Sequence, residues 1–219
     1  METVRRIGAG IFGLTLLAAS AFVVFQEGNW VFLDTQDLDR RVEATIDGQR
    51  LPGLSSVAQF RYLRDCYDDA RFRLGVQSTR GDALVSACRQ GSAEATLATP
   101  ASSFAWYVDA VLAFLDGDFA GYNASLLRSY QTGMREMWIS TQRFRFVEDF
   151  FFVLDDGLKD FHQQEMRAMA FTFAGAKVLA DLYISRPSSR ERILASVEGL
   201  DADKQKWFLA AVQGKAFSR

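Results

Sequence analysis

Residues 60–74, FRYLRDCYDDARFRL, contain the apolar spacing that decides the fold class. Apolar side chains recur there every three or four residues, which places them on one face of a helix. These side chains are Phe60, Leu63, Tyr67, Ala70 and Leu74. A half-buried strand would instead alternate apolar and polar residues, and no long stretch of the chain shows that alternation. The segment therefore predicts an amphipathic helix that packs one face against a core.

The helical pattern continues through the rest of the sequence. Ser188 and Glu191 fit a capping box that opens a late helix, and Asp201 can cap the last one. The chain has only three prolines, which suits helices because proline breaks their interiors. We therefore predict an all-α fold, with a central helix over residues 158–184 that is apolar on nearly every face. The other helices are expected over residues 81–98, 102–115, 119–133 and 136–154.

Short turns between these helices predict antiparallel hairpins. Gly117 lies in one turn, and Trp106 and Ala110 precede it at positions that a tetratricopeptide repeat fills with Trp and with Gly or Ala. Trp138 follows Trp106 by 32 residues, close to the repeat's period of about 34. Tyr122 stands where the repeat has a small residue, and the closing proline is missing. We therefore expect a degenerate tetratricopeptide-like array rather than a regular superhelix.

The run from Ile7 to Phe25 has no charged side chain and follows Arg5 and Arg6. As a helix it would be roughly 28 Å long, close to the hydrocarbon thickness of a bilayer. A signal peptide cleaved near residues 19–21 and an uncleaved signal anchor both fit this pattern. The apolar residues continue past that cleavage site, which favours the anchor and makes the lipid bilayer a partner.

The two arginines also set the expected orientation of the chain. Basic residues stay on the cytoplasmic side of a membrane, so everything after the run is expected to be exported. Ala9 and Gly13 form a small-xxx-small pair that would let a second membrane helix pack closely. The chain is thus divided into a transmembrane helix (1–26), a juxtamembrane segment (27–53) and an exported helical domain (54–219).

Cys66 and Cys88 are the only cysteines in the chain. They are equally far from position 77, in the turn expected between their two helices, so an antiparallel hairpin places them opposite each other. The compartment predicted for them is oxidising, where such pairs form disulfides. We predict a Cys66–Cys88 bond that closes a loop of about 22 residues and stabilises the fold by roughly 3 kcal/mol. The alternative is a pair of small buried thiols.

No motif in the sequence specifies a reaction. There is no Gly-rich phosphate loop, no G-x-S-x-G elbow and no set of cofactor ligands. The net charge of −2 argues against binding to nucleic acid. The acidic residues match no calcium loop, and two thiols offer too few ligands for zinc. We expect no cofactor and no metal.

The acid-rich region between Glu148 and Glu165 leaves one catalytic alternative open. It contains the single histidine, His162, which shares a helical face with Glu165. An envelope hydrolase or lyase could use a pair of these carboxylates, because folding can bring any two together. A solvated acidic face is the structural alternative.

Aromatic residues are dense between Trp138 and Phe150. Trp138, Phe144, Phe146 and Phe150 are too many for one face of a helix, so part of this set is expected to be exposed. Exposed aromatic clusters mark surfaces that bind partners or stack on sugars. The sequence therefore predicts an interaction patch at these four residues.

Five short segments between Cys88 and Ile139 carry a family resemblance. They are Cys88, residues 99–106 (TPASSFAW), residues 117–118 (GD), residues 129–130 (SY) and residues 136–139 (EMWI). In these segments the chain resembles small membrane-anchored proteins of alphaproteobacterial polysaccharide gene clusters, which have a degenerate tetratricopeptide-like periplasmic domain. The resemblance implies a single-pass protein of the bacterial inner membrane, with a cytoplasmic N-terminus and a periplasmic main domain. It implies no catalytic residue.

Together these observations predict a non-enzymatic periplasmic scaffold or accessory subunit, held at the membrane and serving exopolysaccharide or surface-polysaccharide assembly or export. Its partners would be envelope proteins, the bilayer and polysaccharide. An accessory subunit of a membrane electron-transfer complex is a further alternative, since a single span could position it there.

Overall fold

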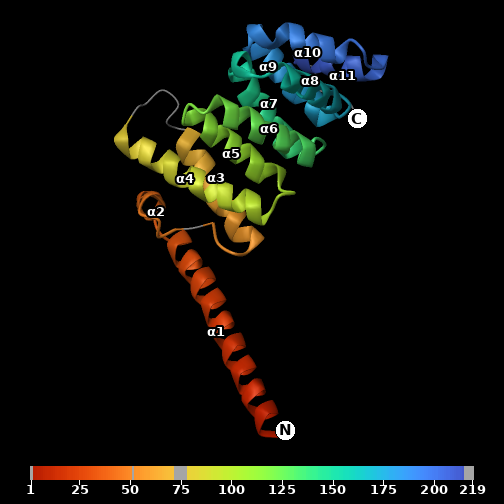
Figure 1. Cartoon of the computed structure of the whole chain (residues 1–219). Helices are drawn as coiled ribbons and strands as arrows, with labels where there is room; N and C mark the ends of the chain where they lie inside the picture. Colours follow the sequence, from red (N-terminus) through yellow and green to blue (C-terminus); the bar gives the residue numbers. More distant parts are fainter. Residues whose placement is uncertain (1, 51, 72–77, 215–219) are drawn as a thin grey trace. The chain divides into compact units, whose positions relative to one another are not determined.

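The computed structural model describes residues 2–50, 52–71 and 78–214 (Figure 1). Side chains are described from Ile11 onward, except those of residues 26, 29, 30 and 34. The described residues form helices and no strand, so the predicted all-α class is confirmed.

The chain divides into two compact units, residues 1–100 and residues 101–219. The segment predicted to be one helical domain, 54–219, is therefore divided at Pro100, and its first part joins residues 27–53 in the first unit. The helices of the first unit are α1 (Glu2–Asp34), α2 (Leu38–Ile46), α3 (Ser56–Arg71) and α4 (Thr79–Ala98).

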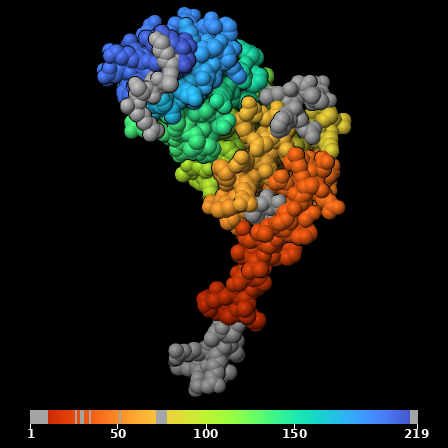
Figure 2. Space-filling view, turned by 180° about the vertical axis from the view of Figure 1, so that it is seen from behind, coloured from red at the N-terminus to blue at the C-terminus, as the bar shows by residue number. Residues whose placement is uncertain are grey.

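Helix α1 contains the apolar run predicted from the sequence. Its side chains from Ile11 to Phe25 are largely exposed, and on the face seen in Figure 2 no other segment covers them. Across the described residues, no single helix has both the length and the apolar composition of a membrane span. The described apolar part of α1, Ile11–Phe25, is shorter than a membrane span. Helices α8 and α9 reach the length and apolar composition of a span only when the two are counted together across their bend. The first residues of the predicted run, and Ala9 of the small-residue pair, lie outside the residues whose side chains are described; Gly13 has open space around it.

The hairpin of α3 and α4 forms the core of the first unit. Tyr62 is buried against α4 at Gly91, where an added Cβ would lie 2.3 Å from the Tyr62 hydroxyl. An alanine at position 91 would therefore require the buried Tyr62 ring to shift. Cys66 and Cys88 are buried between them, with Cα atoms 5.7 Å apart and sulfur atoms at the disulfide distance of 2.06 Å. The predicted pairing of the two cysteines is confirmed.

The inward face of α3 differs from the predicted one at its start. Ala58, Tyr62, Leu63 and Ala70 are buried, whereas Phe60 is 40% exposed. Phe60 was placed inward from its spacing to Leu63, but the buried stripe runs through positions 58, 62, 63, 66 and 70, and residue 60 lies beside it. Leu74, the last residue of the predicted stripe, lies outside the described residues.

Ion pairs attach α2 to this hairpin. The Asp65 carboxylate of α3 accepts hydrogen bonds from Arg41 of α2 at 3.0 Å and from Arg50 at 2.7 Å. Arg50 is 2% exposed and also lies over the Tyr62 ring. The segment from 27 to 53 thus packs on the unit as part of its structure.

The second unit is built from seven α-helices within the described residues. They are α5 (Ser103–Leu115), α6 (Phe119–Gly133), α7 (Met137–Asp149), α8 (Asp156–Ala170), α9 (Phe173–Ser185), α10 (Arg190–Val197) and α11 (Ala202–Val212), with 3₁₀ turns at Phe151–Val153 and Pro187–Ser189. Helices α5 and α6 pack side by side as a hairpin (Figure 1). Gly117 forms their turn with a φ of +79°, which only glycine adopts readily. Ser102 and Asp118 cap the two helices.

The single helix predicted over residues 158–184 is wrong. The structure has two helices there, α8 and α9, bent by 120° at Phe171 and Thr172. The Thr172 hydroxyl accepts a hydrogen bond from the Gly175 amide at 3.0 Å and so begins a new helix. The capping box expected at Ser188 and Glu191 is also wrong, because Pro187–Ser189 is a 3₁₀ turn and α10 begins at Arg190 with no side-chain cap.

Candidate functional site

The second unit buries a network of charged and polar side chains where α6, α7 and α8 meet. Helix α6 contributes Tyr130, α7 contributes Arg143 and Glu148, and α8 contributes His162 and Glu165. All five are at most 5% exposed. Charged groups are almost never buried this deeply unless they are paired. We call these five residues the buried ionic network.

Arg143 is the centre of the network and uses its whole guanidinium. Its Nε donates to Glu165 Oε1 at 3.0 Å, and Nη2 also contacts that oxygen. Its Nη1 and Nη2 donate to the carbonyls of Ser129 and Gly133 at 2.9 and 2.8 Å. These carbonyls belong to the last turn of α6, where helices lack internal donors. Arg143 therefore caps α6, pairs with α8 and stacks over Tyr130, whose ring centroid is 4.9 Å away.

Two opposing effects act on the ionisation of the Glu165 carboxyl group. Burial raises its pKa, while the charge and hydrogen bonds of Arg143 oppose that rise. Its Oε2 atom has no hydrogen-bond partner among the described residues. The carboxylate therefore depends on Arg143 for compensation of its charge.

The rest of the network is a chain of hydrogen bonds. The Tyr130 hydroxyl lies 3.1 Å from His162 Nδ1, and His162 Nε2 lies 2.8 Å from Glu148 Oε1. Arg192 of α10 closes the chain, donating to Glu148 Oε2 at 2.5 Å. Burial raises the pKa of Tyr130 well above its usual range, so its phenol stays protonated and can donate to the imidazole.

Glu148 has the opposite protonation behaviour from Glu165. Burial alone would raise its pKa, but hydrogen bonds from His162 and Arg192 outweigh that effect and lower the pKa to about 2. A carboxylate with a lowered folded-state pKa stabilises the fold above its ordinary pKa near 4.5. That contribution is lost as the pH falls from about 4.5 toward about 2.

We therefore expect Glu148→Gln to lower the free energy of unfolding at neutral pH and to flatten its fall between pH 4.5 and pH 2. Tryptophan fluorescence during urea unfolding at a series of pH values measures both effects. Asp203→Asn is the matched control, because Asp203 is an exposed carboxylate that pairs with Lys206. A Glu148→Gln profile as steep as that of the control would contradict the assignment.

The arrangement of Tyr130, His162 and Glu148 has the order of a proton relay but no access to a substrate. Tyr130 and His162 are fully buried, and Glu148 is 5% exposed. A catalytic acid or base must reach the atom that it protonates. Two carboxylates of the region on which the hydrolase alternative depends, Glu148 and Glu165, are thus used to join helices. Across the described part of the chain, no group of three His, Cys, Asp or Glu side chains could hold a metal ion.

An open pocket lies on the outer side of the network. It has a volume of about 560 Å³. One of its lining residues, Ser140, accepts a hydrogen bond from Arg143 of the network. Its wall is formed by the residues before and in the first turn of α7 and by the end of α8. The lining is Met134, Arg135, Met137, Ser140, Gln164, Arg167, Ala168, Met169, Phe171 and Thr172.

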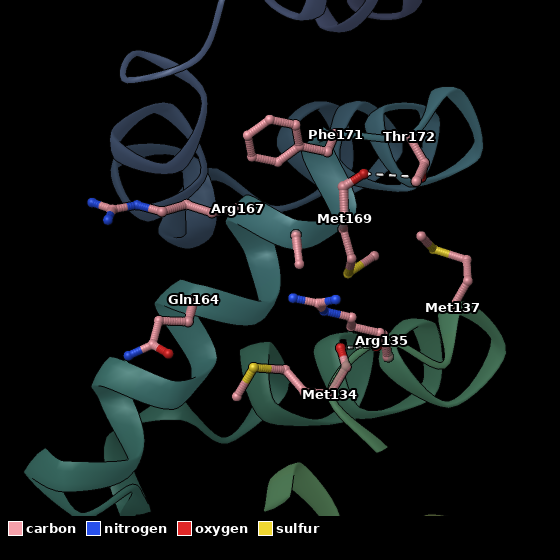
Figure 3. Close-up of a pocket in the computed structure, with 10 residues that line it drawn as sticks. Met134, Arg135, Met137, Gln164, Arg167, Met169, Phe171 and Thr172 are labelled. Atoms are coloured by element: carbon pink, nitrogen blue, oxygen red, sulfur yellow. Dashed lines mark hydrogen bonds between the residues drawn. The ribbon is translucent and has the colours of Figure 1, made fainter. Parts of the chain in front are cut away.

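Three methionines and Arg135 determine the polarity and charge of this pocket. Figure 3 shows Arg135 extending from the start of α7 toward Met169 of α8, whereas Arg167 points to the opposite side. Neither arginine forms an ion pair with a described residue. Methionine side chains adapt to differently shaped apolar ligands. The pocket therefore presents an adaptable apolar surface with an uncompensated positive charge inside it.

The aromatic patch predicted around α7 needs correction. Phe144 is fully buried and Phe146 is 3% exposed, so both belong to the core. Phe150 is half-buried and packs on Phe114, with ring centroids 4.2 Å apart. Trp138 alone is substantially exposed, at 48%. The four residues do not form one surface, because Phe144 and Phe146 are packed in the core.

Sequence reasoning missed the centre of this site. It noticed His162, Glu165 and Glu148 as an acidic region but did not connect them to Arg143, Tyr130 or Arg192. One signal was available in the sequence: Arg143 directly precedes Phe144, which the aromatic spacing places near a core. The pocket was missed because its lining comes from two separate segments, residues 134–140 and 164–172, which no spacing rule connects.

In comparisons with known protein families, with curated proteins and with solved structures, the chain shows no match.

Proposed function

We propose that the chain is a non-enzymatic binding module held at a membrane by α1, with its helical units on the exported side. It would act as a scaffold or accessory subunit of a bacterial envelope complex that assembles or exports surface polysaccharide. The observation that carries this proposal is the pairing of Cys66 and Cys88 in a chain whose α1 exposes its apolar side chains from Ile11 to Phe25.

These two features point to the same compartment. Disulfides persist in oxidising compartments such as the periplasm and are rare in the cytosol. Exposed apolar side chains along a helix are costly in water, and lipid would remove that cost. The basic residues before the run are consistent with a cytoplasmic N-terminus.

A binding role fits the second unit better than catalysis does. Its histidine and its buried carboxylates join helices, as described above, whereas its methionine-lined pocket is open. The α5–α6 hairpin supports the proposal of a degenerate tetratricopeptide-like module, and such hairpins serve as binding surfaces. The polysaccharide process rests on the family resemblance in residues 88–139.

The anchoring part of the proposal has a direct test. In the full chain expressed in a Gram-negative host, we expect the protein to stay in the membrane pellet after alkaline extraction. Under mild unfolding, we expect both cysteines to resist a membrane-impermeant maleimide until a reductant is added. In Cys66→Ser, the remaining Cys88 should react from the periplasmic side after mild unfolding. Release of the protein by alkali, or two free thiols in the untreated protein, would overturn the proposal.

The binding part is tested by charge reversal in the pocket. We expect Arg135→Glu to abolish co-purification of an envelope partner that the wild-type chain retains in mild detergent at fixed stoichiometry. Lys206→Glu is the control, because Lys206 is an exposed cation of the same unit outside the pocket. Equal recovery with both variants would show that the pocket does not bind the partner. A wild-type chain that always purifies alone would reject a scaffold role.

A further inference from the structure

The first unit exposes several large apolar side chains around one end of α4. Leu54 and Val57, before and in the first turn of α3, are 55% and 59% exposed, and Leu97 in the last turn of α4 is 83% exposed. Exposed apolar residues scattered singly need no explanation. These three come from the segment at residues 52–57 and from the end of α4, which meet at one hollow.

That hollow also includes the apolar run of α1. The hollow has a volume of about 330 Å³, and it is lined by Phe22, Pro52, Gly53, Leu54, Gln59, Glu94, Ala95 and Ala98. Phe22 lies three residues before Phe25, which is less than one helical turn from the end of the run. The beginning of α3 and the end of α4 are therefore at the level of the last apolar turn of α1.

Glu27 fixes this level with three hydrogen bonds. Its carboxylate accepts from the backbone amides of Leu54 and Ser55, each at 2.8 Å, and from the Ser55 hydroxyl at 3.0 Å. Amides at a helix start lack internal acceptors, and in a region poor in water they must be satisfied by the protein. Glu27 satisfies them from the first polar turn of α1 after the run.

We propose that the first unit rests on the lipid bilayer, with Leu54, Val57 and Leu97 inserted among the lipids beside α1. The inference rests on the proposed function, since it needs α1 in the membrane. With Phe22 in hydrocarbon, Leu54, which lines the same hollow, reaches the boundary between headgroups and acyl chains. Val57 and Leu97 lie on the two segments that border the hollow, and the exposed Glu94 of its lining is then at the level of the headgroups. Apolar groups at such interfaces insert by about 5–10 Å.

The other end of α4 has the character of a surface in water. Arg80 pairs there with Glu43 at 2.8 Å and with Asp39 at 3.7 Å, and all three side chains are about half exposed or more. Charged groups avoid hydrocarbon. The charge distribution thus orients α4 with Leu97 toward the lipid and Arg80 away from it.

A fifth tryptophan tests this orientation in the full chain, reconstituted in vesicles of phosphatidylcholine and phosphatidylglycerol. Leu97→Trp places the probe at the proposed contact, and Ala83→Trp places it on an exposed turn about 21 Å away along the same helix. The wild-type emission is subtracted from each. We expect lipids brominated near the headgroup end of the acyl chain to remove most of the emission added at position 97, and little of that added at position 83.

The results distinguish failure of the bilayer contact from failure of the membrane anchor. If the vesicles retain the protein after alkaline extraction but the two probes are quenched equally, the bilayer contact is wrong while the membrane anchor stands. If the emission at position 97 is blue-shifted and unquenched, a protein covers the surface and the contact is again wrong. If alkali releases the protein, the anchor and the contact fail together. Preferential quenching at position 97 in retained protein supports the contact.

Discussion

Arg143→Ala is expected to lower the free energy of unfolding of the second unit by about 3–5 kcal/mol, because it leaves a buried carboxylate without its cation. Glu165 is fully buried, and one of its oxygens already lacks a described partner. The same substitution removes the donors to the Ser129 and Gly133 carbonyls at the end of α6. Urea unfolding followed by tryptophan fluorescence measures the loss, since three of the four tryptophans (106, 138 and 207) lie in this unit.

Two variants separate the ionic effect from the loss of side-chain volume. Arg145→Ala shortens an exposed arginine two residues away on the same helix, and surface changes of this kind alter stability by about 0.5 kcal/mol or less. The double variant Arg143→Met with Glu165→Leu removes both charges, so it should be more stable than Arg143→Ala. If Arg143→Ala matches Arg145→Ala, or if the double variant is the least stable of the set, Arg143 does not compensate Glu165.

Helical period predicted most of the fold because it is a local property. The residues of α4, α5 and α6 repeat apolar side chains at helical spacing and have their caps and turns nearby, so their bounds follow from short stretches of sequence. The break between α8 and α9 is different. Apolar residues continue on both sides of Thr172, and only the bend that packs α9 back on the core selects the threonine as a cap.

The candidate site was less predictable because its contacts are distant in sequence. Arg143 and Glu165 are separated by 22 residues, and Arg192 reaches Glu148 over 44. No spacing rule connects residues on different helices. Cys66 and Cys88 were predictable at the same separation as Arg143 and Glu165, because a single turn between adjacent antiparallel helices sets their register.

The aromatic prediction failed for a related reason. Counting aromatics on α7 showed correctly that one helical face could not hold them all. The count could not show that α5 and α6 cover the other faces, where Phe146 meets Tyr107 and Phe114 at ring distances of 6.4 and 5.5 Å. Burial depends on the neighbours that a helix acquires, and only Trp138 remained substantially exposed.

The double variant Cys66→Ala with Cys88→Ala is expected to destabilise the α3–α4 hairpin by roughly 3 kcal/mol, the chain-entropy value for a loop of about 22 residues. Alanine is chosen because both positions are nearly fully buried and serine would bury a hydroxyl. Amide hydrogen exchange measured by mass spectrometry reports on this hairpin separately from the second unit. Exchange through opening of α3 and α4 should accelerate by about two orders of magnitude, since each factor of ten corresponds to about 1.4 kcal/mol.

Reduction of the wild-type chain separates the crosslink from the side chains that carry it. If the bond acts by restricting the unfolded chain, reduced wild type should exchange nearly as fast as the double variant in α3 and α4, while α5 to α11 keep their protection. A double variant that exchanges at the wild-type rate would mean that the packing of Tyr62 on Gly91 holds the hairpin without the disulfide. The disulfide would then be a consequence of the compartment in which the hairpin folds. The stability of the hairpin would come from close packing of α3 on α4.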